Sequence, residues 1–480
     1  YGFYFITDSK PNPRRIEQIQ GDFDIQDRII VDTYTNYQVH EYDSINLVDR
    51  LYHTAGGGRE FYGESFAEGQ TRSFSFDFQN IVPAEQGFLY ADVASDIKSN
   101  SANFAVKVND ESIDINLIKT SNESYVKAFA SSDYTRLNNL TNANRQTVKI
   151  TFTATDISSV GFLNYLEFAA ICQLKMNNDF MSVRSANGYG ENKKVVFAVE
   201  NAKNSTQVWN VTRLDSIYGV PAKMIDGRLY FEADNGNTIQ EFVLLNPSAQ
   251  LGKQVSIVGK ISNQNLHKLK DIDMVFITNE QFLSQAQNLA LVHEQHDGLT
   301  TAVVTDKQVY NEFSSGTPDA TAYRWIMKML YDRATDDSTI NKPRFLLLVG
   351  DGTFDNRKLL SSSGNNLLLT YQARNSVSEV EAYASDDYFA YLDDADGSND
   401  VANTLKISVG RLPVNTVDEA EKLVNKLIKF IHDDSYGKWK NQLLFLGDDG
   451  DDDMHIRAID EAAQYVQNNH ANFQVNKIYL

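Results

Sequence analysis

Acidic residues follow two apolar runs of the sequence, and these are the positions that could carry chemistry. Residues 345–349 run into Gly350-Asp351, and residues 443–446 run into an acidic stretch at 448–455. In an open α/β sheet, loops beyond the carboxyl ends of the strands converge on the functional site. An ordinary strand-to-loop turn explains Asp351 equally well, because Gly and Asp are common in turns.

The second acidic stretch carries five carboxylates within six residues: Asp448, Asp449, Asp451, Asp452 and Asp453. Neighbouring carboxylates repel one another and therefore require solvent, a cation or a basic partner. Three interpretations stay open: a solvated loop, a calcium site at Asp449 and Asp451, or a catalytic role for one of the carboxylates.

A further acidic stretch spans residues 393–400 and resembles half of a calcium loop. It places Asp394, Asp396 and Asp400 around the turn-forming Gly397. It lacks the spaced bidentate Glu of an EF-hand, so an acidic hairpin tip is the alternative. We expect no required cofactor, and calcium bound here would be structural.

The single cysteine and a histidine pair are weak candidates for catalysis. Cys172 alternates with the apolar residues Ala170 and Leu174, which predicts a buried, protonated and inert thiol. One cysteine allows no internal disulfide. His293 and His296 are three residues apart, but no third metal ligand has suitable spacing, so we expect a solvent-facing helix end.

The first half of the chain has the pattern of β-structure. Apolar residues alternate with period two from about residue 71 to residue 176, which predicts an antiparallel β-sandwich of the jelly-roll type. We expect an extended N-terminal segment at 1–65, the sandwich at 66–176 and a small β-rich subdomain at 177–268. The glycines between Gly56 and Gly63 predict a flexible entry to the sandwich.

After about residue 269, apolar runs alternate with helical patterns, which predicts a parallel sheet covered by helices. Pro318 predicts a helix over 318–333, because Pro suits a first helical position. Thr416 and Glu419 form a capping-box pattern before another helix. We expect one α/β subdomain at 269–440 and the start of a second one at 441–480.

Length and charge bound the function. A chain of 480 residues exceeds the size of one hydrophobic core, so we expect about three domains. The net charge of -20 excludes a phosphate-backbone partner and suits an exported protein. No apolar run is long enough for a membrane span. The first residues lack the pattern of a signal peptide, which suggests a removed signal or a start downstream of it.

Five ordered blocks of the α/β half resemble the gingipain-like cysteine peptidases of family C25. They are residues 305–319, 346–351, 385–388, 409–413 and 447–449. The resemblance implies a caspase-like α/β domain, incomplete at its C-terminus, whose catalytic His and Cys come late in a second subdomain. Those two have no counterpart here, so we expect this piece alone to be inactive.

The same resemblance implies a carboxylate that assists the catalytic pair, after the first strand of the second subdomain. Asp453 matches that position best, with Asp448 and Asp449 as alternates. A carboxylate in this role would orient the His and fix its tautomer.

The N-terminal half is similar to that of the type IX secretion sortases of this family, through residues 58–64, the jelly-roll pattern and residues 208–212. This implies a surface enzyme of the outer membrane that removes C-terminal signals from secreted cargo and joins the cargo to anionic lipopolysaccharide, beside an outer-membrane β-barrel partner. A secreted C25 protease without a sorting role is one alternative. A non-catalytic binding module for carbohydrate or cargo is the other.

Overall fold

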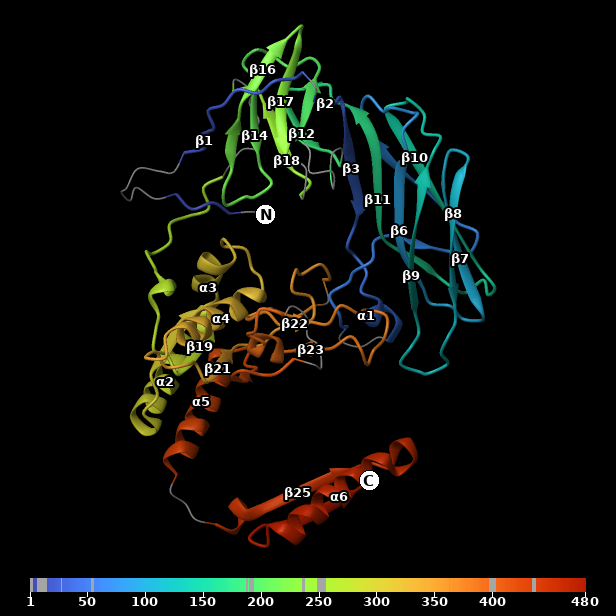
Figure 1. Cartoon of the computed structure of the whole chain (residues 1–480). Coiled ribbons are helices and arrows are strands. Elements are labelled where there is room, and N and C mark those ends of the chain that lie inside the picture. Colours follow the sequence, from blue (N-terminus) through green and yellow to red (C-terminus); the bar gives the residue numbers. More distant parts are fainter. Residues whose placement is uncertain are drawn as a thin grey trace.

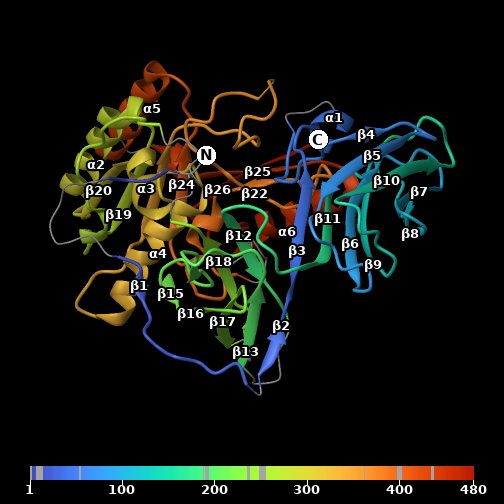
Figure 2. The same ribbon diagram turned by 90° about the horizontal axis from the view of Figure 1, so that it is seen from above.

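The fold combines β-rich regions with an α/β region, as Figure 1 shows. The computed structural model describes residues 3–6, 15–26, 28–52, 56–186, 189, 194–234, 238–247, 256–361, 363–396, 403–433 and 437–480. In Figure 1 a small β region lies at the top, a β-sandwich at the right and the α/β region at the lower left. Figure 2 shows the sandwich and the α/β region at opposite ends of the molecule.

Two antiparallel sheets form the β-sandwich, as the period-two pattern predicts. One sheet has the order β5 (Thr71–Asp77), β10 (Arg145–Ala154), β7 (Ser101–Val108), β8 (Glu111–Ile118). The other has the order β3 (Thr33–Glu41), β11 (Gly161–Gln173), β6 (Gly87–Ser95), β9 (Phe129–Leu137), with β4 (Ser65–Phe66) also paired to β11. Their inward side chains, Phe104, Phe152 and Phe168 among them, share one buried core.

The smaller β region also consists of two sheets over one core. The first sheet has the order β1 (Glu17–Gln18), β15 (Tyr218–Val220), β14 (Gln207–Asn210), β18 (Glu241–Leu245), β12 (Phe180–Arg184). The second has the order β16 (Ala222–Ile225), β17 (Arg228–Asp234), β13 (Lys194–Val199), β2 (Ile29–Val31). The N-terminal segment is therefore divided, because β1 and β2 pair here and β3 pairs in the sandwich. Asn-Gly pairs favour tight turns, but Asn235-Gly236 lies outside the described residues.

The α/β region is built on four parallel strands in the order β20 (Thr301–Thr305), β19 (Met274–Thr278), β21 (Phe345–Val349), β24 (Ser408–Leu412). Side chains alternate along β19: Met274 and Phe276 pack with α2 (Leu283–Asp297) and α5 (Val417–His432). Val275 and Ile277 pack on the other face with α3 (Asp306–Phe313) and α4 (Thr321–Asp336). Helices thus cover both faces, as a parallel sheet requires.

Two local predictions for this region have different outcomes. The capping box of Thr416 and Glu419 is confirmed at the start of α5. The helix predicted from Pro318 begins instead at Thr321, whose N–H donates to the Asp319 carboxylate at 2.8 Å. Strand β24 was not predicted, because Gly410 and Arg411 interrupt its apolar run.

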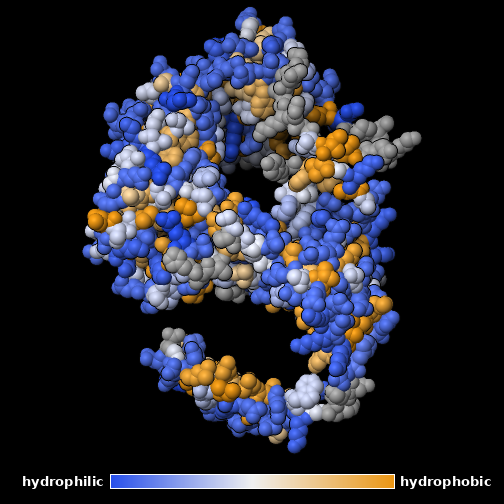
Figure 3. Space-filling view, turned by 180° about the vertical axis from the view of Figure 1, so that it is seen from behind, coloured by the Kyte–Doolittle hydropathy of each residue, from blue (hydrophilic) through white to orange (hydrophobic). Residues whose placement is uncertain are grey.

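The C-terminal residues form a separate unit of two parallel strands, β25 (Gln442–Gly447) and β26 (Gln474–Tyr479), joined by α6 (Gly450–Asn469). The interpretation of the acidic stretch as a solvated loop does not hold from Gly450 onward, because α6 begins there. Leu444, Leu446 and Ile478 are exposed, and Figure 3 shows a band of apolar side chains on this unit.

Short elements complete the described structure. They are α1 (Leu47–Tyr52), β22 (Tyr371–Gln372), β23 (Ala384–Ser385) and the 3-10 helices η1 (Leu266–Lys268), η2 (Glu280–Phe282), η3 (Asp387–Ala390) and η4 (Lys438–Asn441). Over the described ranges, none of the helices combines the length and the apolar character that a bilayer crossing needs.

Replacing Cys172 with Ser tests the structural role of the thiol. Cys172 is fully buried in the sandwich core, so the more polar hydroxyl should lower the free energy of unfolding by about 1 to 2 kcal/mol. Urea denaturation measures this difference. Unchanged stability would contradict the prediction, as would a complete loss of peptidase activity in a full-length Cys172→Ser protein that still folds.

Candidate functional site

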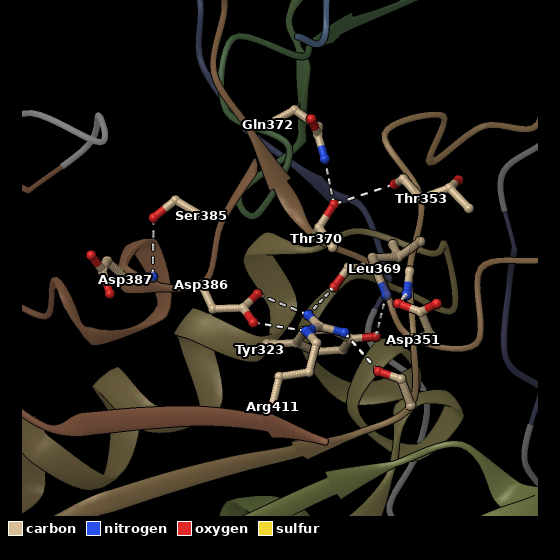
Figure 4. A network of polar contacts seen from close by, with 12 residues as sticks. Tyr323, Asp351, Thr353, Leu369, Thr370, Gln372, Ser385, Asp386, Asp387 and Arg411 are labelled. Carbon is tan, nitrogen blue, oxygen red and sulfur yellow. Dashed lines mark hydrogen bonds and ion pairs between the residues drawn. The ribbon is translucent and has the colours of Figure 1, made fainter. Parts of the chain in front are cut away.

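The guanidinium of Arg411, on the edge strand β24, joins three segments at the carboxyl end of the parallel sheet. Its Nε and Nη2 atoms donate to the two carboxylate oxygens of Asp386 at 2.7 and 2.8 Å. The other donors reach the carbonyl oxygens of Gly350 at 3.0 Å and Leu369 at 2.9 Å. Figure 4 shows Asp386 and Leu369 converging on this group. We call this arrangement the Arg411 clamp.

The carboxylate of Asp351 stabilises the turn that follows β21. One oxygen accepts the N–H of Gly352 at 2.9 Å, and the other accepts the Asn415 side-chain amide at 2.9 Å. The carbonyl of Asp351 also accepts the N–H groups of Leu367 and Leu368. The turn interpretation of Asp351 is therefore the one that the geometry favours.

Asp306 is the most perturbed carboxylate at this edge of the sheet. It follows β20, the residue is 9% exposed, and its Oδ1 is buried without a hydrogen-bond partner among the described residues. Burial raises the pKa of Asp306 to about 6, although the backbone N–H and the charge of Lys307 oppose the shift. Asp306 can therefore take up a proton near pH 6.

The segment between Asp351 and Asp386 is held by hydrogen bonds between side chains and backbone. Asn366 accepts the N–H and the hydroxyl of Thr353 at 2.7 and 2.8 Å, and Gln372 donates to Thr370 at 2.5 Å. Figure 4 shows Thr353, Thr370 and Gln372 beside the Arg411 clamp. We call residues 352–385 the connecting loop.

The connecting loop also packs against the N-terminal glycines, so the expectation of a flexible entry at 56–63 is wrong. Gly57 and Gly58 are buried, and a Cβ on either one would overlap the carbonyl oxygen of Ala382 or Asn375. Gly58 also has φ +72, which favours glycine. Glycine is used here for close backbone approach and not for flexibility.

Ion pairs and an aromatic contact add to the packing between the N-terminal segment and the connecting loop. We call this contact region the seam. Glu60 pairs with Arg374 at 2.7 Å, and Asp43 pairs with Arg357 at 2.7 Å. The rings of Phe61 and Phe354 stack with their centroids 6.5 Å apart. The segment between β3 and β4 therefore contacts the connecting loop, which leads directly into Asp386 of the Arg411 clamp.

The acidic stretch at 448–455 lies in the C-terminal unit, which Figure 1 shows apart from the four-stranded sheet. Asp448, Asp449 and Asp453 are exposed, and Asp453 lies in the first turn of α6 with φ 64. The side chain of Asp451 is outside the described part. The structure therefore places Asp453 in the helix that follows β25 and does not bring it to the Arg411 clamp.

The acidic residues near 394 contact basic side chains. Asp394 pairs with Lys328 at 2.7 Å, which lowers the pKa of Asp394, and Asp393 pairs with Lys406 at 2.7 Å. Asp396 accepts the N–H of Asp393 at 3.0 Å, and Asp400 lies outside the described residues. In the described ranges, three or more His, Cys, Asp or Glu side chains do not gather in a metal-binding group. Calcium stays a prediction.

The remaining candidates have structural surroundings. Burial raises the pKa of Cys172 to about 11, as expected for an inert thiol. His293 and His296 both contact the carboxylate of Asp297 at the end of α2, at 2.6 and 2.7 Å. This agrees with the predicted helix end.

Sequence reasoning missed Asp306 and the pairing of Arg411 with Asp386. Both partners of the clamp stand in blocks that carried the family resemblance, so that resemblance was the available signal. Asp306 stood in the first such block, directly after an apolar run, but no pattern indicated the burial of its carboxylate.

Comparisons with known proteins show what these features are similar to. Residues 267–480 match the model of peptidase family C25. The crystal structure of dimeric latent PorU from Porphyromonas gingivalis aligns with a TM-score of 0.74 and 27% identity, over 89% of this chain and 40% of that chain. The chain thus spans well under two thirds of the length of that protein.

A shorter match is a CBM36-1 domain of a multidomain xylanase from the hindgut metagenome of Trinervitermes trinervoides. It covers 28% of this chain and 96% of that domain, with 14% identity and a TM-score of 0.18. No curated protein matches the chain.

Replacing Gly58 with Ala should weaken the seam strongly. The new Cβ would meet the Asn375 backbone and add strain at positive φ, at a cost of about 2 to 4 kcal/mol. Gly69→Ala is the matched control, since Gly69 has φ +71 with nothing within 4 Å, and should cost only about 1 kcal/mol. Urea denaturation of both variants measures the difference, and equal losses would contradict the close packing.

Replacing Asp306 with Asn should change how stability depends on pH. The folded pKa is raised, so the contribution of Asp306 is favourable below about pH 4 and is lost as the pH rises through 6. Asn stays neutral, so the variant should be more stable by about 2 to 3 kcal/mol at pH 7.5, with the gain vanishing near pH 3.5. Denaturation at both pH values, with exposed Asp336→Asn as control, tests this. A gain that does not depend on pH would contradict it.

Proposed function

Because the chain is gingipain-like, matches peptidase family C25 over residues 267–480 and is similar to PorU, we propose that the complete protein is a cysteine endopeptidase acting as a type IX secretion signal peptidase and sortase. In this proposal the enzyme removes C-terminal signals from secreted cargo at the cell surface. It then joins the new carboxyl end to anionic lipopolysaccharide, beside an outer-membrane β-barrel partner.

The extent of the likeness to PorU is the observation that carries the proposal. The alignment covers 89% of the chain, while the C25 match begins at residue 267, so the likeness includes the β-rich half. A likeness limited to the peptidase region would favour a secreted C25 protease without a sorting role equally well.

The chemistry of the proposal is acyl transfer. A cysteine thiolate attacks the scissile carbonyl, and the peptide C–N bond breaks as a His protonates the leaving amine of the C-terminal signal. The acyl group of the resulting thioester then passes to water or an amine, which frees the thiolate. Cys172 is unsuited to this role because it is buried and its pKa is raised to about 11. We therefore assign the nucleophile and the His to the part of the C25 domain that follows this chain in the full-length protein.

A cargo assay separates the sorting role from its alternatives. The full-length protein is incubated with a cargo that carries its C-terminal signal and with an amine acceptor, and the products are identified by mass spectrometry. The sorting role predicts cleaved cargo joined to the amine. Cleaved cargo with a free carboxyl end supports a protease without sorting, and intact cargo supports a binding module for carbohydrate or cargo.

Replacing Asp453 with Asn in the full-length protein tests the proposed His-orienting carboxylate. Loss of such a group lowers turnover by up to about ten-thousand-fold in a triad enzyme, and the effect can be smaller in a Cys-His pair. Asp448→Asn and Asp449→Asn cover the alternate positions, and exposed Glu461→Gln on α6 is the control. If all three Asp variants fold and cleave cargo at the wild-type rate, the assignment is wrong.

Calcium binding at the acidic stretches is part of the proposal as a structural feature. Hard cations take six to eight oxygen ligands, so a bound ion should raise the melting temperature. Melting the protein with calcium and with a chelator measures this. The same melting temperature at every calcium level would remove calcium from the account.

A further inference from the structure

A pocket of about 400 Å³ opens at the seam between the β-sandwich and the connecting loop. Glu41 and Tyr165 line it from the sandwich, and Arg357 and Arg374 line it from the connecting loop. Its volume is in the range of small-molecule sites, which occur preferentially between domains. We call it the seam pocket.

The charges of the seam pocket mostly neutralise one another. Three arginines and three carboxylates line it. Arg357 is paired with Asp43 and Arg374 with Glu60, both at 2.7 Å. Within the described part of the chain, Arg59 and Glu41 have no ion-pair partner, so one charge of each sign is left for a ligand.

The guanidinium of Arg59 is held in place by its neighbours, but no carboxylate among the described residues pairs with it. The Arg59 backbone N–H donates to the carbonyl of Ala373 at 2.9 Å, which fixes the main chain. Its guanidinium lies over the ring of Tyr371, 5.6 Å from the centroid. A guanidinium held in this way keeps its donors available for a carboxylate, which it binds with two parallel hydrogen bonds.

The sandwich side of the seam pocket offers an amide and an aromatic surface. Asn164 is 6% exposed and donates to Asp92 at 3.2 Å, which holds the amide in place. Tyr165 stacks on Tyr90 with centroids 5.5 Å apart, so its ring is also supported from behind. These fixed groups need little reordering when a ligand binds.

We propose that the seam pocket binds a zwitterionic ligand of the amino-acid or short-peptide class, with its carboxylate on Arg59 and its ammonium on Glu41. A purely anionic ligand would be repelled by Glu41, and a purely cationic one by Arg59. This inference goes beyond the proposed peptidase function, because it needs neither the catalytic pair nor a cleavage step.

Titration calorimetry with the tripeptide Gly-Tyr-Gly tests the proposal on this chain. The free peptide should bind saturably at the seam pocket. N-acetylation removes the ammonium and C-amidation removes the carboxylate, and each should weaken binding about tenfold, because a charge-assisted hydrogen bond is worth that much or more. No saturable binding, or equal binding of the free and blocked peptides, would overturn the proposal.

Two variants assign the charges within the seam pocket. Arg59→Gln should weaken the free peptide about tenfold and leave no further loss on C-amidation, and exposed Glu41→Gln should do the same for N-acetylation. Exposed Arg136→Gln on β9 is the control and should bind like the wild type. Wild-type affinity in both seam variants would overturn the proposal. Glu41→Gln alone decides the matter if Arg59→Gln does not fold, as judged by its thermal melt.

Discussion

The Arg411 clamp is the interaction on which the arrangement at the carboxyl edge depends. The Arg411 side chain is 11% exposed, so it has lost most of its hydration and needs its four hydrogen bonds in return. These bonds reach the end of β21, the connecting loop and the turn before η3. Segments distant in sequence are therefore fixed to one edge strand, where the loops of a parallel sheet converge.

The connecting loop links this clamp to the β-sandwich. It leads directly into Asp386, which pairs with Arg411. The loop also packs on the N-terminal glycines and pairs with Glu60 and Asp43. The β-rich half is thus more than an appended module, because it contacts the loop that shapes the carboxyl edge of the four-stranded parallel sheet. The seam pocket lies at this junction, so a ligand there would contact both regions together.

Sequence patterns predicted the regular helices and strands of this structure. They failed for segments whose conformation depends on contacts with residues distant in the sequence. The period-two runs and the Thr416 capping box are local signals, and both are confirmed. From the sequence, the glycines at 56–58 resemble a flexible linker. In the structure, the backbone of Ala382 packs against them. Asp386 and Arg411 were marked by the family resemblance, but their pairing depends on the turn before η3 folding onto the edge strand β24.

The proposed sorting activity rests on the likeness to PorU, whereas the central structural claim concerns the clamp. The most direct test is a double-mutant cycle with Arg411→Met and Asp386→Leu, followed by urea denaturation. A partly buried bidentate pair that organises the edge predicts a coupling energy of about 2 kcal/mol, since each single variant leaves one charge unpaired. Losses that add to within about 0.5 kcal/mol would contradict the account, because the two residues would then act independently.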